Sequence, residues 1–319
     1  MNFATPLKIV ALDRDTLPKR EFALNFEHEL ISYGFTAPED TLARIQGADI
    51  IITNKVVITA EAIAQNPQLK LIAVTATGVN NVDTAAAKQA GVAVCNIRAY
   101  GNESVAEHAF MLMIALMRNL PAYQRDVTEG LWQQSPFFCH FGAPMRDLNG
   151  KTLAIFGRGG IGQTLAGYAR AFNMNVIFGE HKHADTVREG YVAFDEAIHG
   201  ADVVSLHCPL TEQTADMIAA AEFKQMKNNA VLINCGRGGL VNETDLIDAL
   251  QQGQIGGAGF DVLTTEPPRQ GHPLLDANLP NLIITPHMPW ASTEAVNRLF
   301  DILLDNINGF VAGKPQNLV

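Results

Sequence analysis

The chain has little of what marks disulfide-rich, metal-binding and nucleic-acid-binding proteins. Its 319 residues include four cysteines, which form neither a Cys-x-x-Cys pair nor a cluster with histidines, so we expect reduced thiols and no metal site. Positive charge is also scarce: the formal net charge is -10, and Lys and Arg do not cluster. Binding to nucleic acid would need such clusters. The expected partner is therefore a small molecule.

The sequence also lacks an apolar run long enough to cross a bilayer. The longest run, residues 109–117, is too short and continues a helical segment that contains Glu107, His108 and Arg118. The first residues, MNFATPLKIVALD, lead directly into a strand-like run and lack the apolar stretch of a signal peptide. We expect a cytoplasmic protein without membrane contact.

What the chain does have is a regular alternation of strand-like and helix-like segments, which is typical of parallel sheets with crossover helices. A length of 319 residues, 47% of them hydrophobic, is enough for two domains with separate cores. Early strand-like runs lie at 8–12, 49–53, 71–75 and 93–96, with helical stretches that include 59–65 and 82–89. Later runs lie at 152–156, 175–178, 202–206, 230–234, 257–262 and 281–285. The pattern predicts an α/β protein with two doubly wound parallel sheets, the second with the strand count of a dinucleotide-binding domain.

Three segments lie outside these runs. A long helix is predicted over residues 104–120, with Pro121 closing it. Residues 123–147 follow no regular period, and the aromatic residues Trp132, Phe137 and Phe138 within them favour a dimer contact, because exposed aromatics usually mark interfaces. Residues 291–313 have helical periodicity. Composition does not decide whether this last helix packs on the first unit, which would make that domain discontinuous.

A glycine fingerprint, LAIFGRGGIGQTLA, places Gly157, Gly159 and Gly162 between an apolar strand and a helix. In a dinucleotide-binding turn the first glycine permits the tight turn and the second lets a pyrophosphate approach the backbone. The third lets helix and strand pack closely. Free N–H groups at the helix N-terminus would then bind the phosphates.

The residues after the next strand bear on the choice of cofactor. Glu180 would accept hydrogen bonds from the adenosine ribose and repel a 2'-phosphate, which favours NAD. His181 and Lys182 act in the opposite direction and leave NADP as an alternative cofactor.

Three residues with catalytic capacity, Arg237, Glu266 and His287, each follow the end of a short apolar run. The carboxyl ends of parallel strands meet at one crevice, so these side chains are expected to converge. Reduction of a 2-keto acid needs a cation for the carboxylate and a proton donor for the carbonyl oxygen, which an arginine and a histidine can supply. A carboxylate beside the histidine stabilises the imidazolium and fixes its orientation. Each residue alone has an ordinary structural explanation, but their joint position favours a catalytic trio.

These residues lie in the motifs NCGRGGLV, DVLTTEPP and TPHMPWAS. Together with TATGVNNVD and the glycine fingerprint, the motifs resemble the D-2-hydroxyacid dehydrogenase family over nearly the whole chain. ATGVNNVD, TTEPP and HMPWAS look most like the glycerate dehydrogenases, also called hydroxypyruvate reductases. Two positions depart from the family pattern: Glu180 stands where many relatives carry Asp, and Pro289 stands where a small residue is commoner.

The resemblance implies a flavodoxin-like substrate domain (residues 1–101 and 288–319), a Rossmann NAD-binding domain (residues 102–287) and a homodimer formed through the NAD-binding domains. It implies that Arg237, Glu266 and His287 are catalytic, and that the substrate carboxylate binds the backbone at Thr77, Gly78 and Val79 together with Arg237 and His287. Asp261 should face the nicotinamide carboxamide. The other expected cofactor contacts are Gly157, Gly159, Gly160, Ile161, Gly162, Glu180, His181, His207, Cys208, Pro209, Thr214, Cys235 and Gly236.

The expected reaction is therefore the NAD-dependent interconversion of hydroxypyruvate and D-glycerate, with reduction of glyoxylate as well. Phosphoglycerate dehydrogenase is the nearest alternative, but it needs a cationic pocket for a phosphate, for which only Lys55 offers itself among the early turns. Other D-2-hydroxyacid dehydrogenases fit less well. An NADH-sensing, corepressor-like binding protein also stays open, since such proteins can retain the trio; turnover near about 10 per second would favour the enzyme.

Overall fold

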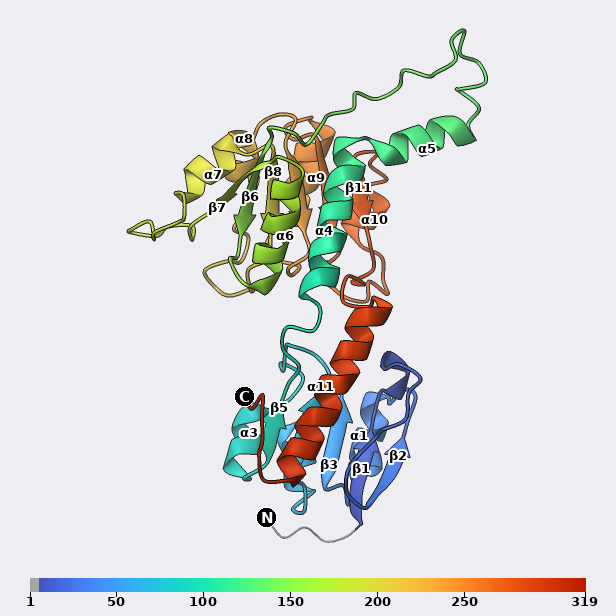
Figure 1. The fold of residues 1–319 in the computed structure, drawn as a ribbon, viewed down its shortest axis with the longest axis vertical. Coiled ribbons are helices and arrows are strands. Elements are labelled where there is room, and N and C mark those ends of the chain that lie inside the picture. The colour runs from blue at the N-terminus through green and yellow to red at the C-terminus, as the bar shows by residue number, and fades with distance from the viewer. Residues whose placement is uncertain (1–5) are drawn as a thin grey trace. The chain divides into compact units, whose positions relative to one another are not determined.

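The computed structural model describes residues 6–319, so the first five residues of the expected N-terminal segment lie outside the described part. The chain divides into two compact units: Met1–Gly101 with Ala291–Val319, and Asn102–Trp290. In Figure 1 the red C-terminal helix belongs to the same unit as the blue N-terminal strands. Each unit contains one parallel sheet.

The first unit has a five-stranded parallel sheet with the order β2-β1-β3-β4-β5, which is the flavodoxin-like order. Its strands are β1 (Leu7–Ala11), β2 (His28–Ser32), β3 (Ile50–Thr53), β4 (Leu71–Val74) and β5 (Ala93–Cys95). Its helices are α1 (Thr41–Ile45), α2 (Ala60–Ala64), α3 (Thr84–Gln89) and α11 (Thr293–Val311), with short 3-10 turns at Arg14–Thr16 and Pro38–Asp40.

Alternate residues of these strands are buried on the two faces of the sheet. On one face, Ile9 and Ile52 pack in a cluster with Phe300 of α11. On the other face, Ile51 packs in a cluster with Ile63 of α2. Strands covered on both faces read as continuous apolar runs, which is why the sequence signal for the central strands is strong. The C-terminal helix thus completes the core that the N-terminal strands begin.

The second unit has a six-stranded parallel sheet with the order β11-β10-β9-β8-β6-β7. Its strands are β6 (Thr152–Phe156), β7 (Asn175–Phe178), β8 (Val203–Leu206), β9 (Val231–Asn234), β10 (Gly257–Phe260) and β11 (Leu282–Ile284). Its helices are α4 (Asn102–Met117), α5 (Leu120–Thr128), α6 (Gly160–Ala171), α7 (Phe194–Gly200), α8 (Ala220–Gln225), α9 (Glu243–Gln251) and α10 (Pro273–Asp276). The chain crosses from β7 back past β6 to β8, so the strand order reverses beside β6. Ligands of open α/β sheets bind at such a reversal, outside the carboxyl ends of the strands.

Two layers of helices cover this sheet. Leu112 of α4 and Leu165 of α6 pack with Ile155 on one face. Phe223 of α8 and Leu246 of α9 pack in the cluster on the other face. The sheet is therefore rigidly held, and the loops at its carboxyl edge are fixed by the strands that they follow.

An arm, which we define as residues 120–147, leaves the end of α4. Figure 1 shows α5 and the chain after it extending away from the rest of the second unit. The arm has its own hydrogen bonds: Trp132 Nε1 donates to the carbonyl of Phe138 (3.0 Å) and Ser135 Oγ to that of Cys139 (2.6 Å). Its conformation is thus defined although its aromatic rings are exposed.

The predicted fold class is confirmed, and every predicted strand is present within two residues at either end. Two elements differ from the prediction. The edge strand β2 was not predicted, and Pro121 lies in the first turn of α5 instead of only ending the preceding helix. Within residues 6–319, no helix is both long enough and apolar enough to cross a membrane.

Candidate active site and dinucleotide site

The glycine turn connects β6 to α6 and is shaped by the absence of side chains. Gly157 has φ +110°, and a Cβ at this position would lie 2.6 Å from the backbone of His207. A Cβ on Gly162 would overlap with the carbonyl oxygen of Gly157, whereas one on Gly159 would meet nothing within 4 Å. Gly157 and Gly162 are thus required by the protein's own packing, and Gly159 leaves open space above the turn. Gly160 and Ile161 form the first turn of α6, whose N-terminus has no side-chain cap.

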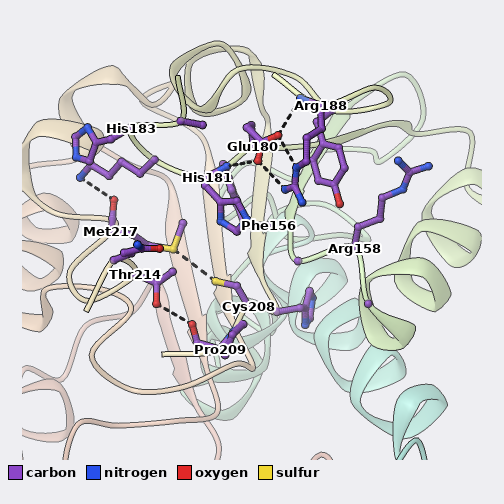
Figure 2. A pocket seen from close by; sticks show the side chains of 18 residues that line it. Phe156, Arg158, Glu180, His181, His183, Arg188, Cys208, Pro209, Thr214 and Met217 are labelled. Atoms are coloured by element: carbon purple, nitrogen blue, oxygen red, sulfur yellow. Dashed lines mark hydrogen bonds and ion pairs between the residues drawn. The ribbon is translucent and has the colours of Figure 1, made fainter. Parts of the chain in front are cut away.

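A cavity of about 700 Å³ lies beside this turn, at the carboxyl ends of β6, β7 and β8. Figure 2 shows the side chains that line it. Several of the residues predicted to contact the cofactor line it, namely Gly157, Gly159, Glu180, His181, His207, Cys208, Pro209 and Thr214. Arg158, Lys182, His183, Arg188 and Tyr191 also contribute to the wall.

Glu180 lies in the cavity wall, but its carboxylate already has partners in the protein. Arg188 donates to it through Nε (2.7 Å) and Nη2 (2.6 Å), and the backbone N–H groups of Arg188 and His181 donate at 3.0 and 2.8 Å. The Arg188 hydrogen bonds, acting against burial, hold the pKa of Glu180 at about 2. The glutamate is ionised and paired, and does not present the free acceptor expected for a ribose.

The other polar residues of the cavity differ in whether their side chains are free to bind a ligand. Lys182 is turned to the protein, with an ion pair to Glu222 (2.8 Å) and a hydrogen bond to the carbonyl of Met217 (3.0 Å). Burial lowers the pKa of His207 to about 4, so its imidazole is neutral. Nε2 of this ring contacts Ser205 Oγ (2.8 Å), whereas its buried Nδ1 has no partner in the described part of the chain. Burial raises the pKa of Cys208 to about 11, which keeps its thiol protonated and unreactive.

At the other end of the sheet, His287 and Glu266 form a close pair. His287 Nδ1 lies 2.7 Å from Glu266 Oε2, and the N–H of Leu263 donates to Oε1 at 2.8 Å. Burial acts to raise the pKa of Glu266, but the hydrogen bonds from His287 and Leu263 and the charges of His287 and Arg237 outweigh it, so this pKa lies below its usual range. The carboxylate is therefore ionised and oriented toward the imidazole.

The backbone of His287 is fixed in a conformation that residues other than glycine seldom adopt. Its φ is +55°, and its N–H donates to the carbonyl of Asp261 (2.9 Å). The carbonyl of His287 accepts a hydrogen bond from Trp290 Nε1 (2.9 Å). Pro289 thus leaves Trp290 in contact with the histidine segment. Such strained positions are often functional.

Arg237 lies in the loop after β9, close enough for its charge to act on Glu266. A Cβ on the adjacent Gly238 would overlap with the carbonyl oxygen of Leu263, so the glycine lets this loop lie directly against the loop that carries Glu266. Asn234 holds the turn through a bond from Nδ2 to the carbonyl of Arg237 (2.9 Å). The guanidinium is exposed, with one hydrogen bond to the carbonyl of Gly236 (2.7 Å).

A buried network that was not predicted lies beside the trio. Thr285 Oγ1 donates to Asp261 Oδ1 (2.5 Å), and His108 Nε2 of α4 contacts Thr285 Oγ1 at 2.9 Å. Burial raises the pKa of Asp261 and lowers that of His108. Asp261 Oδ2 is buried and has no partner among the described residues. An unpaired buried acceptor of this kind suits an amide donor from a ligand.

The other predicted residues lie outside both groups. Cys235 is buried, which raises its pKa, and it packs in the sheet's core. Gly236 does not line the cavity but precedes Arg237 directly. The first unit contains Thr77, Gly78 and Val79. Thr77 Oγ1 donates a hydrogen bond to the carbonyl of Ile97 (3.0 Å), and the carbonyl of Thr77 accepts one from Asn96 Nδ2 (2.7 Å).

Comparisons with known proteins identify the family to which the chain belongs. The family model "D-isomer specific 2-hydroxyacid dehydrogenase, NAD binding domain" matches residues 110–289. The glycerate dehydrogenase of Methylorubrum extorquens is 48% identical over 313 residues, which cover 98% of this chain and 98% of the relative. The hydroxypyruvate reductase of Blautia hydrogenotrophica is 37% identical over 322 residues, covering 98% and 99%.

A solved structure is similar over the same extent. The D-lactate dehydrogenase from Aquifex aeolicus, complexed with NAD and lactic acid, has a TM-score of 0.80 at 27% identity and covers 98% of each chain. The chain therefore belongs to the D-2-hydroxyacid dehydrogenase family, and is an NAD-dependent oxidoreductase.

Proposed function

We propose that the protein interconverts hydroxypyruvate and D-glycerate with NAD as cofactor, and that it also reduces glyoxylate. The observation that carries this proposal is the His287–Glu266 pair at 2.7 Å, with Arg237 acting on the same carboxylate. The names of the two relatives at 48% and 37% identity support the choice of substrate within the family.

The residues of the second unit fit NAD. Gly159 leaves open space above the uncapped N-terminus of α6, where backbone N–H groups can bind the pyrophosphate. The unpaired Nδ1 of His207 and Oδ2 of Asp261 are polar atoms that a ligand would complete. When bound, NADH supplies the two electrons and the hydrogen that reduce the keto carbon.

The side chains then have separate roles. The Arg237 guanidinium binds the substrate carboxylate through two parallel N–H donors and polarises the adjacent carbonyl. The imidazolium of His287 donates its proton to the carbonyl oxygen, and in the reverse direction the imidazole accepts the hydroxyl proton. Glu266 fixes the ring through Nδ1, which leaves Nε2 for the substrate.

The first unit has candidate backbone donors of its own for a carboxylate. Among the hydrogen bonds formed within residues 6–319, none uses the N–H groups of Thr77, Gly78 or Val79. Consecutive unpaired N–H groups form concave anion sites. The role of these three residues stays a prediction. Individual proline replacements, which remove the backbone N–H, should raise the KM of the keto acid, and an unchanged KM would contradict the role.

The function is tested by following NADH oxidation with hydroxypyruvate, glyoxylate, pyruvate and 3-phosphohydroxypyruvate. We expect the highest kcat/KM with hydroxypyruvate, with turnover of about 10 per second or more. The variant His287→Asn should lose turnover but still bind NADH. Absence of turnover with every keto acid, or near-normal turnover of His287→Asn, would contradict the proposal.

We further propose a cytoplasmic homodimer formed through the second unit. The four cysteines are free thiols, which suits a reducing compartment. Apolar side chains of α4 and α6 line a groove of about 690 Å³, and the arm presents Phe138 and Phe141 at 93% and 83% exposure. Apolar surface of this extent usually meets a partner. A second copy of the chain carries both surfaces.

A further inference from the structure

The cavity at the end of β7 has an electrostatic character opposite to that expected from Glu180. In NAD-specific sites the acidic residue after this strand accepts hydrogen bonds from the ribose hydroxyls and repels a 2'-phosphate. Here both oxygens of Glu180 accept two hydrogen bonds each from Arg188 and from the backbone. A carboxylate has about four lone-pair sites. Its capacity is filled within the protein, and the side chain is only 2% exposed.

The charge of Glu180 is also balanced. The guanidinium of Arg188 contacts it in bidentate geometry, while the arginine itself is about half exposed. Of the hydrogen bonds formed in the described part of the chain, none uses Nη1 of Arg188. The outer edge of this guanidinium therefore remains available to a ligand in the cavity, which Arg188 lines.

A second guanidinium contacts the same aromatic ring as the first. Arg188 Cζ is 4.1 Å from the ring centre of Tyr191, and Arg158 Cζ is 5.4 Å from the same ring and 4.9 Å from that of Phe178. Figure 2 shows Arg158 and Arg188 on the same side of the cavity as Glu180. The aromatic contacts hold both cations in place. Asp185 and Glu189, the acidic residues of the same segment, do not line the cavity.

From this arrangement we propose that Arg188 and Arg158 form a binding site for a phosphate monoester on the adenosine ribose, so that the protein binds NADPH as well as NADH. Two arginines provide planar pairs of donors that match phosphate oxygens. The structure assigns this role to the arginines and not to Lys182, whose ammonium is already paired with Glu222. The inference concerns the coenzyme and holds whichever keto acid is the substrate.

The test is direct binding, which needs no turnover. NADPH and NADH are titrated against the full chain by fluorescence or calorimetry, and adenosine 2',5'-bisphosphate and 5'-AMP serve as probes that differ only in the 2'-phosphate. Wild-type protein should bind NADPH within about tenfold of NADH. Because each charge-assisted contact is strong, Arg188→Gln should weaken NADPH binding by about tenfold or more and change NADH binding by less than about threefold.

A second test variant and a control variant complete the experiment. Arg158→Gln leaves the Glu180–Arg188 pair intact and should still weaken selectively the binding of NADPH and of the bisphosphate probe. Arg170→Gln, on the exposed last turn of α6 and outside the cavity lining, should change neither. The proposal is overturned if wild-type protein binds NADPH more than about a hundredfold more weakly than NADH. Equal weakening of both coenzymes by Arg188→Gln and Arg158→Gln would overturn it as well. A protein that binds both coenzymes but reduces no keto acid would refute the proposed function alone.

Discussion

Glu266 fixes the orientation of the imidazole at the candidate active site. It accepts the N–H of Leu263 through one oxygen and contacts His287 Nδ1 through the other, so the carboxylate cannot rotate away without losing a hydrogen bond. Since the pKa of Glu266 is lowered, the carboxylate remains ionised across the neutral range. A fixed negative charge beside an imidazole favours proton donation by the ring, which is the role proposed for His287.

Replacing Glu266 by Gln should therefore change the pH dependence of reduction. The amide keeps a hydrogen bond to the ring but removes the fixed charge beside it. Keto-acid reduction should therefore fall off at a lower pH than in the wild type, because that charge no longer favours proton donation by the ring. The pH profile of kcat/KM measures this shift. The matched control is Asp126→Asn, which removes the carboxylate that lies 3.0 Å from Nε2 of another histidine, His140. If the pH profile of Glu266→Gln coincides with those of the wild type and of this control, the electrostatic role of Glu266 is disproved.

The single residues show where sequence reasoning succeeds. Arg237, Glu266 and His287 could be proposed because each follows a strand end, and parallel strands bring their carboxyl ends together. Arg188 could not, because its partner Glu180 is reached by a loop whose path has no periodic signal. His108 also gave no signal, since its contact with Thr285 joins an apolar helix to a strand end 177 positions away.

At the scale of elements, the contact of α6 with β6 depends on Gly162. A methyl group at this position would overlap with the carbonyl oxygen of Gly157 in the glycine turn. Gly167 lies on the same helix, is exposed, and would place a Cβ in open space. The two glycines therefore separate the effect of close packing from that of helix propensity.

Gly162→Ala should destabilise the fold by about 1–3 kcal/mol, as overpacked positions do, and should weaken NADH binding because the turn is displaced. Gly167→Ala should stabilise the helix by about 0.5–1 kcal/mol, because alanine loses less backbone entropy. Denaturant unfolding and NADH titration of both variants check this. Equal stability of the two variants would show that the turn can yield to the added methyl group.

The elements also show which parts of the fold the sequence encodes plainly. Strands buried on both faces, such as β3 and β9, could be predicted from continuous apolar runs. The edge strand β2 is half exposed and carries His28, Glu29 and Ser32, so it has no such run. The helix α5 was obscured by Pro121, since proline ends one helix and is equally suited to the first turn of the next.

At the scale of the whole molecule, the second unit carries an exposed apolar groove and an arm with exposed aromatic rings. Met111 on α4, Phe172 at the end of α6 and Leu120 at the start of the arm are each about half exposed along one groove. The arm is held by its own hydrogen bonds, so its rings are not free to fold back. In the homodimer that we propose, burial of these surfaces against the same surfaces of a second copy would form a symmetric interface.

Met111→Glu should therefore shift the protein from dimer to monomer. A carboxylate in the centre of an apolar interface must be desolvated without a partner, which costs several kcal/mol, whereas in the monomer the half-exposed side chain stays in water. Sedimentation velocity at micromolar concentration measures the change. Phe35→Glu is the control, because Phe35 is an exposed apolar residue of the first unit and its replacement should leave the dimer intact. If the wild-type chain sediments as a monomer, the proposed dimer is refuted. If the Met111→Glu variant still sediments as a dimer, the subunits meet through another surface.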